Sequence, residues 1–179
     1  MIVDEAYIDF GGETALPLID KYDNLVVVRT FSKSRSMAGL RIGYAISNPE
    51  LIKALNDVKY SYNSYTMNRP SLVLGVESIH DDAYFREKVG QIIATRERFV
   101  KEIAELGFTC LPSSANFVFA THESIPAKEI FAAAKENNIY VRYFDKPRID
   151  NYLRISIGTD AEMDAFVAFL KGYVETKQN

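Results

Sequence analysis

The sequence has a single cysteine, no tryptophan and no long hydrophobic run. One cysteine, Cys110, excludes an internal disulfide and is compatible with a reducing compartment, so we expect a cytoplasmic protein. No segment approaches the roughly 20 apolar residues that span a bilayer, so we expect no membrane partner. The net charge of −3 lacks the positive surplus that nucleic acids and anionic lipids attract. These absences leave small molecules and other proteins as partners.

The composition is that of an ordinary globular protein, with 47% hydrophobic and 25% charged residues. A chain of 179 residues can bury roughly 70% of its unfolded surface, enough for one domain or one and a half. Strand-like and helix-like segments alternate in the first part, which favours a parallel or mixed α/β sheet. From Phe108 onward the segments are typical of a small α+β domain.

The most informative stretch runs from Leu25 to Tyr44 and reads LVVVRTFSKSRSMAGLRIGY. Four β-forming residues followed by small and basic ones predict a buried strand that ends at a polar site. Lys33, just past that strand, is a candidate amine nucleophile of the Schiff-base kind. Arg41 can hold a phosphate as a two-pronged donor. The alternative interpretation is a solvated basic loop, and Arg35 is assigned no role.

Thr-Phe-Ser-Lys followed by Ala-Gly-Leu-Arg-Ile-Gly resembles the lysine motif of fold-type I pyridoxal-phosphate aminotransferases, in the branch that contains histidinol-phosphate aminotransferase. The resemblance implies that Lys33 is the catalytic residue and holds pyridoxal 5'-phosphate. It also implies that Thr30 and Ser32, whose side chains should share one side of the extended segment, hold the cofactor phosphate together with Arg41.

The Asp-Glu-Ala-Tyr segment at residues 4–7 resembles a second motif of the same family. The resemblance implies that Asp4 pairs with the pyridine nitrogen of the cofactor and that Tyr7 hydrogen-bonds its phenolic oxygen. A carboxylate there favours the protonated ring, which then withdraws electrons. Asp4 and Glu5 are neighbours on a strand and point to opposite faces, so they would not chelate a metal together. No metal site is expected.

Two arginines stand in strand patterns of the second half. Arg154, in Leu-Arg-Ile-Ser-Ile-Gly-Thr, needs an anionic partner or water, because arginine is almost never buried unpaired. The resemblance implies that Arg154 binds the acidic group of the substrate and that Arg142, in Ile-Tyr-Val-Arg, binds the substrate phosphate. The alternative is an ordinary ion pair with a nearby carboxylate.

The expected fold is therefore α/β, the C-terminal part of the large domain of a pyridoxal-phosphate transferase, followed by a small α+β domain. We place the large-domain portion at residues 1–65 and the small domain, with a long connecting helix, at 66–179. Expected strands include residues 40–46, 115–121 and 139–143. Expected helices include residues 67–79 and 126–137, and a capping box at Thr159–Glu162 should open the last helix.

The resemblance implies amino transfer between an amino acid or amino phosphate and a 2-oxo acid, most specifically histidinol phosphate and 2-oxoglutarate, in a homodimer. It covers only the C-terminal half of the family, and the chain begins inside a strand. We therefore expect a truncated or excised chain without transaminase activity by itself. Two alternatives stay open: a related decarboxylase acting on threonine phosphate, and a non-catalytic domain that packs against a partner.

Overall fold

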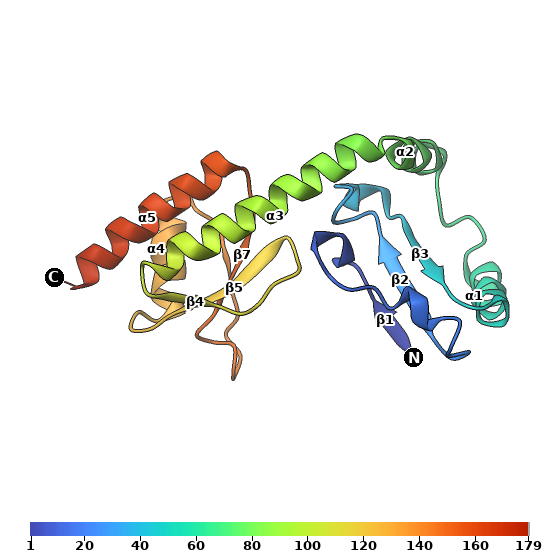
Figure 1. Cartoon of the computed structure of the whole chain (residues 1–179), viewed down its shortest axis with the longest axis horizontal. Helices are drawn as coiled ribbons and strands as arrows, with labels where there is room; N and C mark the ends of the chain where they lie inside the picture. Colours follow the sequence, from blue (N-terminus) through green and yellow to red (C-terminus); the bar gives the residue numbers. More distant parts are fainter. Residues whose placement is uncertain (179) are drawn as a thin grey trace. The chain divides into compact units, whose positions relative to one another are not determined.

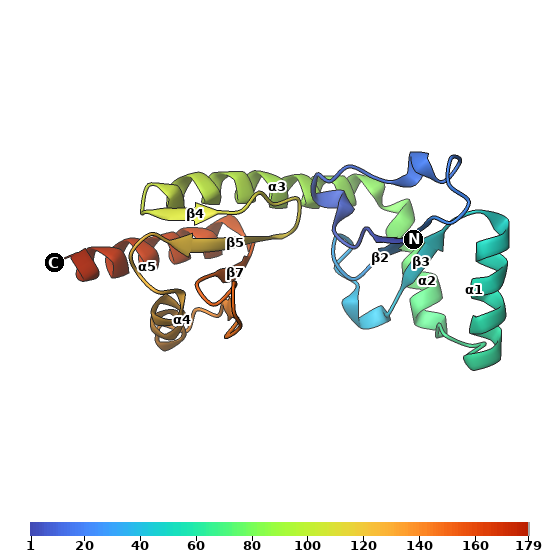
Figure 2. The same ribbon diagram turned by 90° about the horizontal axis from the view of Figure 1, so that it is seen from below.

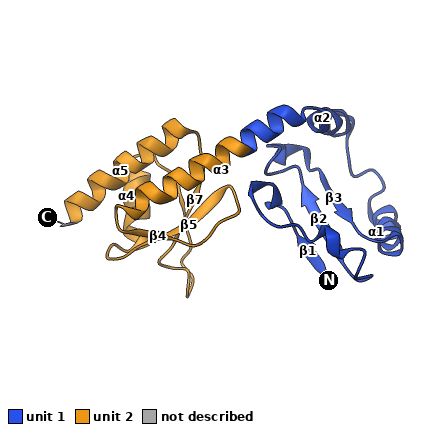
Figure 3. Cartoon of the chain, in the orientation of Figure 1, with its two compact units in different colours: residues 1–89 blue, residues 90–179 orange. Residues whose placement is uncertain are grey.

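The computed structural model describes residues 1–178. The chain forms two compact units, Met1–Val89 and Gly90–Asn179, which are described separately (Figure 3). The boundary between these units lies inside helix α3 (Asp82–Ala104). Helix α2 (Arg69–His80), which precedes α3, belongs to the first unit. Its Ser71 Oγ donates to the carbonyl of Leu40 in that unit at 2.9 Å. The sequence-based division at residue 65 stays a prediction about domains of the complete protein.

The first unit contains a mixed three-stranded sheet in the order β1 (Ile2–Asp4), β2 (Val26–Thr30) and β3 (Gly43–Ile46) (Figure 1). β1 and β2 are parallel, whereas β3 runs antiparallel to β2. The buried β2 residues Val26 and Val27 are part of the unit's core. This mixed sheet confirms the α/β class expected for the first part of the chain.

The return strand starts later than expected. A 3-10 turn occupies Ala38–Leu40, and Arg41 adopts the left-handed conformation with φ of 56°. Only after this reversal can the chain pair with β2, so the strand begins at Gly43 rather than at residue 40. Further 3-10 turns occupy Ile8–Phe10 and Leu16–Leu18.

Helices α1 (Pro49–Tyr62) and α2 (Arg69–His80) follow the sheet. Each begins at an asparagine cap: the side chains of Asn48 and Asn68 both accept a backbone N–H bond at 2.9 Å. Large apolar side chains on both helices are exposed, namely Leu55, Val58, Leu72, Val73, Val76 and Ile79. The α1–α2 surface of this unit is therefore apolar.

The second unit has a four-stranded antiparallel sheet in the order β4-β5-β7-β6, visible in part in Figure 2. The elements are β4 (Phe108–Cys110), β5 (Phe117–His122), α4 (Ala127–Glu136), β6 (Arg142–Tyr143), β7 (Leu153–Ser156) and α5 (Asp160–Gln178). The fully buried core comes from α3, α4, α5 and the inner sheet face, through Phe99, Ile103, Val118, Ile130, Leu153 and Leu170. This unit confirms the α+β expectation.

Two boundary predictions in the second unit have different outcomes. The capping box is confirmed, because the backbone N–H of Thr159 donates to Glu162 Oε2 at 2.7 Å. The strand expected at residues 139–143 is wrong in extent, since β6 comprises only Arg142 and Tyr143. Asn138 before it takes a left-handed φ of 59°, which turns the chain out of α4 instead of continuing it as a strand. Along residues 1–178, no helix is long and apolar enough to cross a bilayer.

Candidate active site

The lysine loop begins where β2 ends. Lys33 lies three residues past Thr30, and its side chain is half-buried. Its Nζ atom is 5.4 Å from the centre of the Tyr7 ring. Tyr7 follows β1, and parallel neighbours such as β1 and β2 end at the same edge of a sheet. The structure thus brings together the two residues that the sequence linked to the reactive end of the cofactor.

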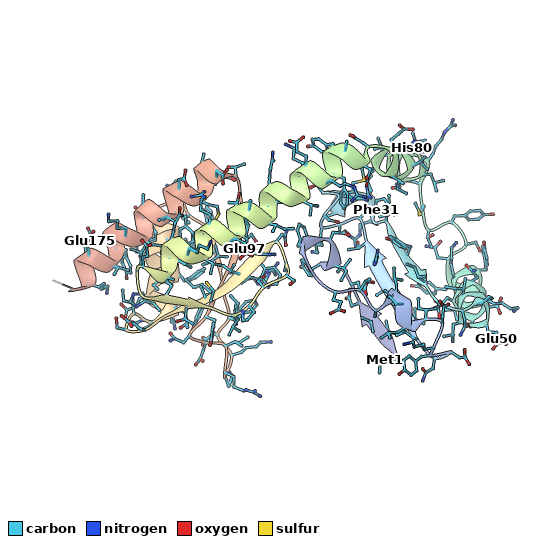
Figure 4. All side chains as sticks on the ribbon, viewed as in Figure 1. Met1, Phe31, Glu50, His80, Glu97 and Glu175 are labelled. Carbon is cyan, nitrogen blue, oxygen red and sulfur yellow. The ribbon has the colours of Figure 1, made fainter. Side chains whose placement is uncertain are left out.

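The hydroxyls of Thr30 and Ser32 form a direct pair. Thr30 Oγ1 and Ser32 Oγ are 2.9 Å apart, and the backbone N–H of Ser32 donates to Thr30 Oγ1 at 3.0 Å. Both side chains therefore lie on one side of the segment, as the alternation predicted. Phe31 (labelled in Figure 4) is buried, and its N–H donates to the carbonyl of Ile42 at 3.1 Å. The loop is thereby tied to the strand that follows Arg41.

Arg41 is exposed, and its guanidinium hydrogen-bonds within its own turn. Nη1 donates to the carbonyl of Ala38 at 2.8 Å. Among residues 1–178, the guanidinium makes no hydrogen bond to the hydroxyls of Thr30 or Ser32. Arg41 directly precedes Ile42, whose carbonyl accepts the N–H of Phe31 in the lysine loop. The charge of Arg41 is open to solvent.

Asp4 is exposed at the end of β1, where its Oδ1 accepts the backbone N–H of Ala6 at 2.9 Å. It is the direct strand partner of Val28. Because successive side chains on a strand alternate, Val28 and Thr30 share a face of the sheet, and Asp4 shares it with them. The acid and the hydroxyl pair are thus displayed on the same face.

A buried ion pair lies beside these residues, and it was not predicted from the sequence. Glu5 and Arg29 meet at 2.9 Å, with side-chain exposures of 4% and 20%. The rule applied to Arg154, that an arginine in a strand pattern needs an anion, would have flagged Arg29 in the same way.

The second unit pairs the two predicted substrate arginines. Arg142 of β6 and Arg154 of β7 are direct strand partners. They line one hollow of about 270 Å³ together with Tyr140, Val141 and Ser156. Two like charges side by side repel each other unless an anion lies between them. The hollow therefore has the chemistry of an anion site.

Arg154 is held by its strand neighbour rather than by an acid. Its guanidinium carbon lies 4.1 Å from the centre of the Phe117 ring. Nε is buried and has no hydrogen-bond partner among the described residues. Arg142 lies 5.3 Å from the centre of the Phe144 ring. In the described part of the chain neither arginine forms a salt bridge of 4.0 Å or less, so the ion-pair alternative has no support there.

The first unit thus carries a lysine at the carboxyl end of a parallel strand pair, and the α+β unit carries a pair of arginines on neighbouring strands. The family model described as aminotransferase class I and II matches residues 1–170. The chain belongs to this family.

The comparisons with individual proteins agree with this family. The chain is 51% identical over 172 residues to the histidinol-phosphate aminotransferase of Brachyspira hyodysenteriae. This match covers 96% of this chain and 49% of the relative. The solved histidinol-phosphate aminotransferase of Clostridium acetobutylicum matches with 27% identity and a TM-score of 0.88, over 98% of this chain and 54% of that one. The chain spans about half the length of the curated relatives it matches.

A third match carries a ligand in its name. It is the histidinol-phosphate aminotransferase of Sinorhizobium meliloti in complex with pyridoxal-5'-phosphate, 29% identical with a TM-score of 0.83. The match covers 98% of this chain and 48% of that structure.

Proposed function

We propose that this chain provides the C-terminal half of a pyridoxal-phosphate-dependent aminotransferase that transfers the amino group of histidinol phosphate to 2-oxoglutarate. The observation that carries the proposal is the placement of Lys33 Nζ beside the Tyr7 ring, at the sheet edge where β1 and β2 end. The high identity to a histidinol-phosphate aminotransferase supports the choice of substrate.

The residues present fit the cofactor. The Thr30 hydroxyl donates to Ser32 Oγ, which leaves the Ser32 hydroxyl proton to be offered to a phosphate. The solvent-exposed guanidinium of Arg41 supplies a cation suited to the same group. Asp4 presents a carboxylate on the same sheet face as Thr30. When bound, pyridoxal 5'-phosphate supplies an electron sink that makes the Cα–H bond of the substrate acidic.

Each residue then has a definite task. Lys33 would hold the cofactor through its amine, and the free amine would carry a proton to and from the substrate Cα. Asp4 keeps the proton on the ring nitrogen, since a nearby carboxylate favours the positively charged form. Tyr7 orients the phenolic oxygen by a hydrogen bond.

Substrate recognition falls to Arg142 and Arg154. Their shared hollow and the unpartnered Arg154 Nε favour a bidentate anion, either carboxylate or phosphate. Histidinol phosphate and 2-oxoglutarate both carry such groups, so one arginine pair can serve both half-reactions. This dual use supports the proposed substrates over a neutral amine.

We also infer that the protein is a cytoplasmic homodimer when complete. The exposed apolar side chains on α1 and α2 support an association surface in this unit. Sedimentation velocity of the complete protein tests the dimer, and a sharp monomer boundary at micromolar concentration would contradict it. The domain boundary at residue 65 is tested by limited proteolysis of the same sample.

The decisive experiment joins this chain to the missing half. In a chimera, the chain replaces the matching C-terminal half of the Brachyspira relative, and histidinol phosphate-dependent formation of glutamate is measured. We expect activity that Lys33→Ala abolishes and that Lys53→Ala, an exposed lysine of α1, retains. A folded chimera that is indifferent to Lys33→Ala, or that decarboxylates threonine phosphate instead, would overturn the proposal.

The chain by itself should be inactive. Half of a phosphate site gains only part of the binding free energy, so we expect no absorption band of bound cofactor that saturates at micromolar concentration. At millimolar cofactor, Lys33 should still be the preferred site of borohydride-trapped labelling. A saturable band at micromolar cofactor would contradict this expectation.

A further inference from the structure

The carboxylate of Glu5 is enclosed by three neighbours from two segments, the loop that holds Thr14 and Ala15 and strand β2. Arg29 of β2 donates from Nε to Oε2 at 3.0 Å, and Thr14 Oγ1 donates to the same oxygen at 2.9 Å. The backbone N–H of Ala15 donates to Oε1 at 2.6 Å. Arg29 Nη2 also donates to Thr14 Oγ1 at 3.0 Å, which closes a ring of three side chains. Both carboxylate oxygens are therefore hydrogen-bonded.

This ring lies where β1 ends beside β2. The N–H of Glu5 donates to the carbonyl of Val28 at 2.9 Å, so the parallel ladder continues one residue past Asp4. The contacting side chains of Glu5 and Arg29 share one face of the sheet. Their chain neighbours, Asp4 and Thr30, point to the opposite face because side chains alternate along a strand.

Burial of a charge pair is a weak source of net stability, because the desolvation of both charges offsets much of their attraction. What the pair does supply is geometry. A slip of β1 by one residue would separate Glu5 from Arg29 and turn Asp4 to the wrong face. The pair therefore penalises every register except the one in which Asp4 and Thr30 share a face.

We propose that Glu5 and Arg29 are a positioning pair: from the far face of the sheet they hold β1 in register on β2 and so set the spacing between Asp4 and the Thr30–Lys33 segment. Neither residue touches the cofactor in this scheme. The inference rests on the proposed function, since the spacing matters only if Asp4 and Lys33 act on one molecule.

The test uses this chain and pyridoxal 5'-phosphate itself. Each variant is incubated with the cofactor, reduced with borohydride and digested, and labelling of Lys33 is compared with that of the exposed Lys101 by mass spectrometry. The variants are Glu5→Gln, Arg29→Gln and the double change. The matched control is Asp57→Asn, which breaks the exposed Lys53–Asp57 pair on α1.

We expect each single change to lower the Lys33-to-Lys101 ratio about tenfold and the double change to lower it no further, because residues that act as a unit are not additive. The control should leave the ratio unchanged. Labelling is done at 10 °C after circular dichroism has shown that each variant is folded. Hydrogen exchange at the amide of Glu5, which donates to Val28, reports the register directly.

Two kinds of failure are distinguishable. If the unaltered chain shows no preference for Lys33, the proposed function fails, whereas faster exchange at the Glu5 amide in the variants would still support the register claim. If the folded variants keep both the ratio and the exchange rate of the unaltered chain, the positioning pair is refuted. If a single change unfolds the chain, the double variant Glu5→Gln/Arg29→Gln, which carries no charge at either position, is tested instead. Its Lys33-to-Lys101 labelling ratio and the exchange rate of its residue 5 amide then decide whether the positioning pair exists.

Discussion

The guanidinium carbon of Arg35 lies 4.1 Å from the centre of the Phe85 ring, in the first turn of α3. It also lies 5.4 Å from the centre of the Phe31 ring. Nη1 also donates to the backbone carbonyl of Ser78, which stands in the last turn of α2 where carbonyls lack helical partners. One side chain thus fastens the turn that follows Lys33 to both helices of the α2–α3 corner.

Removing this fastening should weaken the first unit. We expect Arg35→Leu to lower the free energy of unfolding by about 1–2 kcal/mol, because it deletes a partly desolvated cation–π contact and leaves the Ser78 carbonyl unpaired. Arg35→Lys should fall in between, since it keeps the charge without the planar stacking. Urea unfolding measures both. Arg86→Leu, at an exposed ion pair on α3, is the control and should have no measurable effect; equal losses would contradict the assignment.

The Glu5 carboxyl should make stability depend on pH in acid. Burial raises the pKa of Glu5, but the hydrogen bonds from Ala15, Arg29 and Thr14 outweigh it, so this pKa lies below its ordinary value of 4.5. A lowered folded pKa stabilises the fold above pH 4.5, and this contribution disappears as pH falls through the folded pKa.

The prediction concerns the difference between two proteins. The gap in melting temperature between the unaltered chain and Glu5→Gln should be constant from pH 7 to about pH 5 and shrink below pH 4.5. Differential scanning calorimetry across this range measures the gap. A gap that stays constant down to pH 3 would show that Glu5 does not titrate with folding.

Cys110 should react slowly with thiol reagents. Burial raises the pKa of its thiol to about 11, so only a very small fraction is thiolate at neutral pH. We expect the rate with an aromatic disulfide reagent to increase about tenfold per pH unit between pH 7 and pH 9. Unfolding in urea should accelerate the reaction at pH 7. A fast reaction of the folded chain at pH 7 would contradict this environment.

Two glycines should respond to alanine in opposite directions. Gly107 has a φ of 84°, and an added Cβ would lie 3.0 Å from His122 Nε2. Gly107→Ala should therefore cost about 1–2 kcal/mol. Gly90 lies inside α3 with nothing within 4 Å of an added Cβ, so Gly90→Ala should stabilise by about 0.5–1 kcal/mol. Urea unfolding of the pair measures both, and two changes of the same sign would show that this explanation is wrong.

Local chemistry made much of the site predictable. The run of valines at residues 26–28 predicts a buried strand, and Thr30 and Lys33 after it predict a polar site at the end of that strand. Both predictions follow from local sequence alone. The alternation of strand side chains likewise predicts that Thr30 and Ser32 share a side, which their 2.9 Å contact confirms. Arg142 and Arg154 are separate in the sequence, and their pairing could not be predicted because strand order follows from packing, not from spacing.

The sequence by itself determined the family, the mixed α/β sheet followed by an α+β unit, and the identity of the candidate residues, because motifs and hydrophobic periods are local properties. The tertiary structure alone decided which partner each charged side chain contacts. Glu5 and Arg29 are far apart along the chain, as are Arg35 and Phe85, and each contact exists only because parallel strands and packed helices bring distant segments within reach. Charge pairing depends on distance in space, and no local pattern encodes that distance.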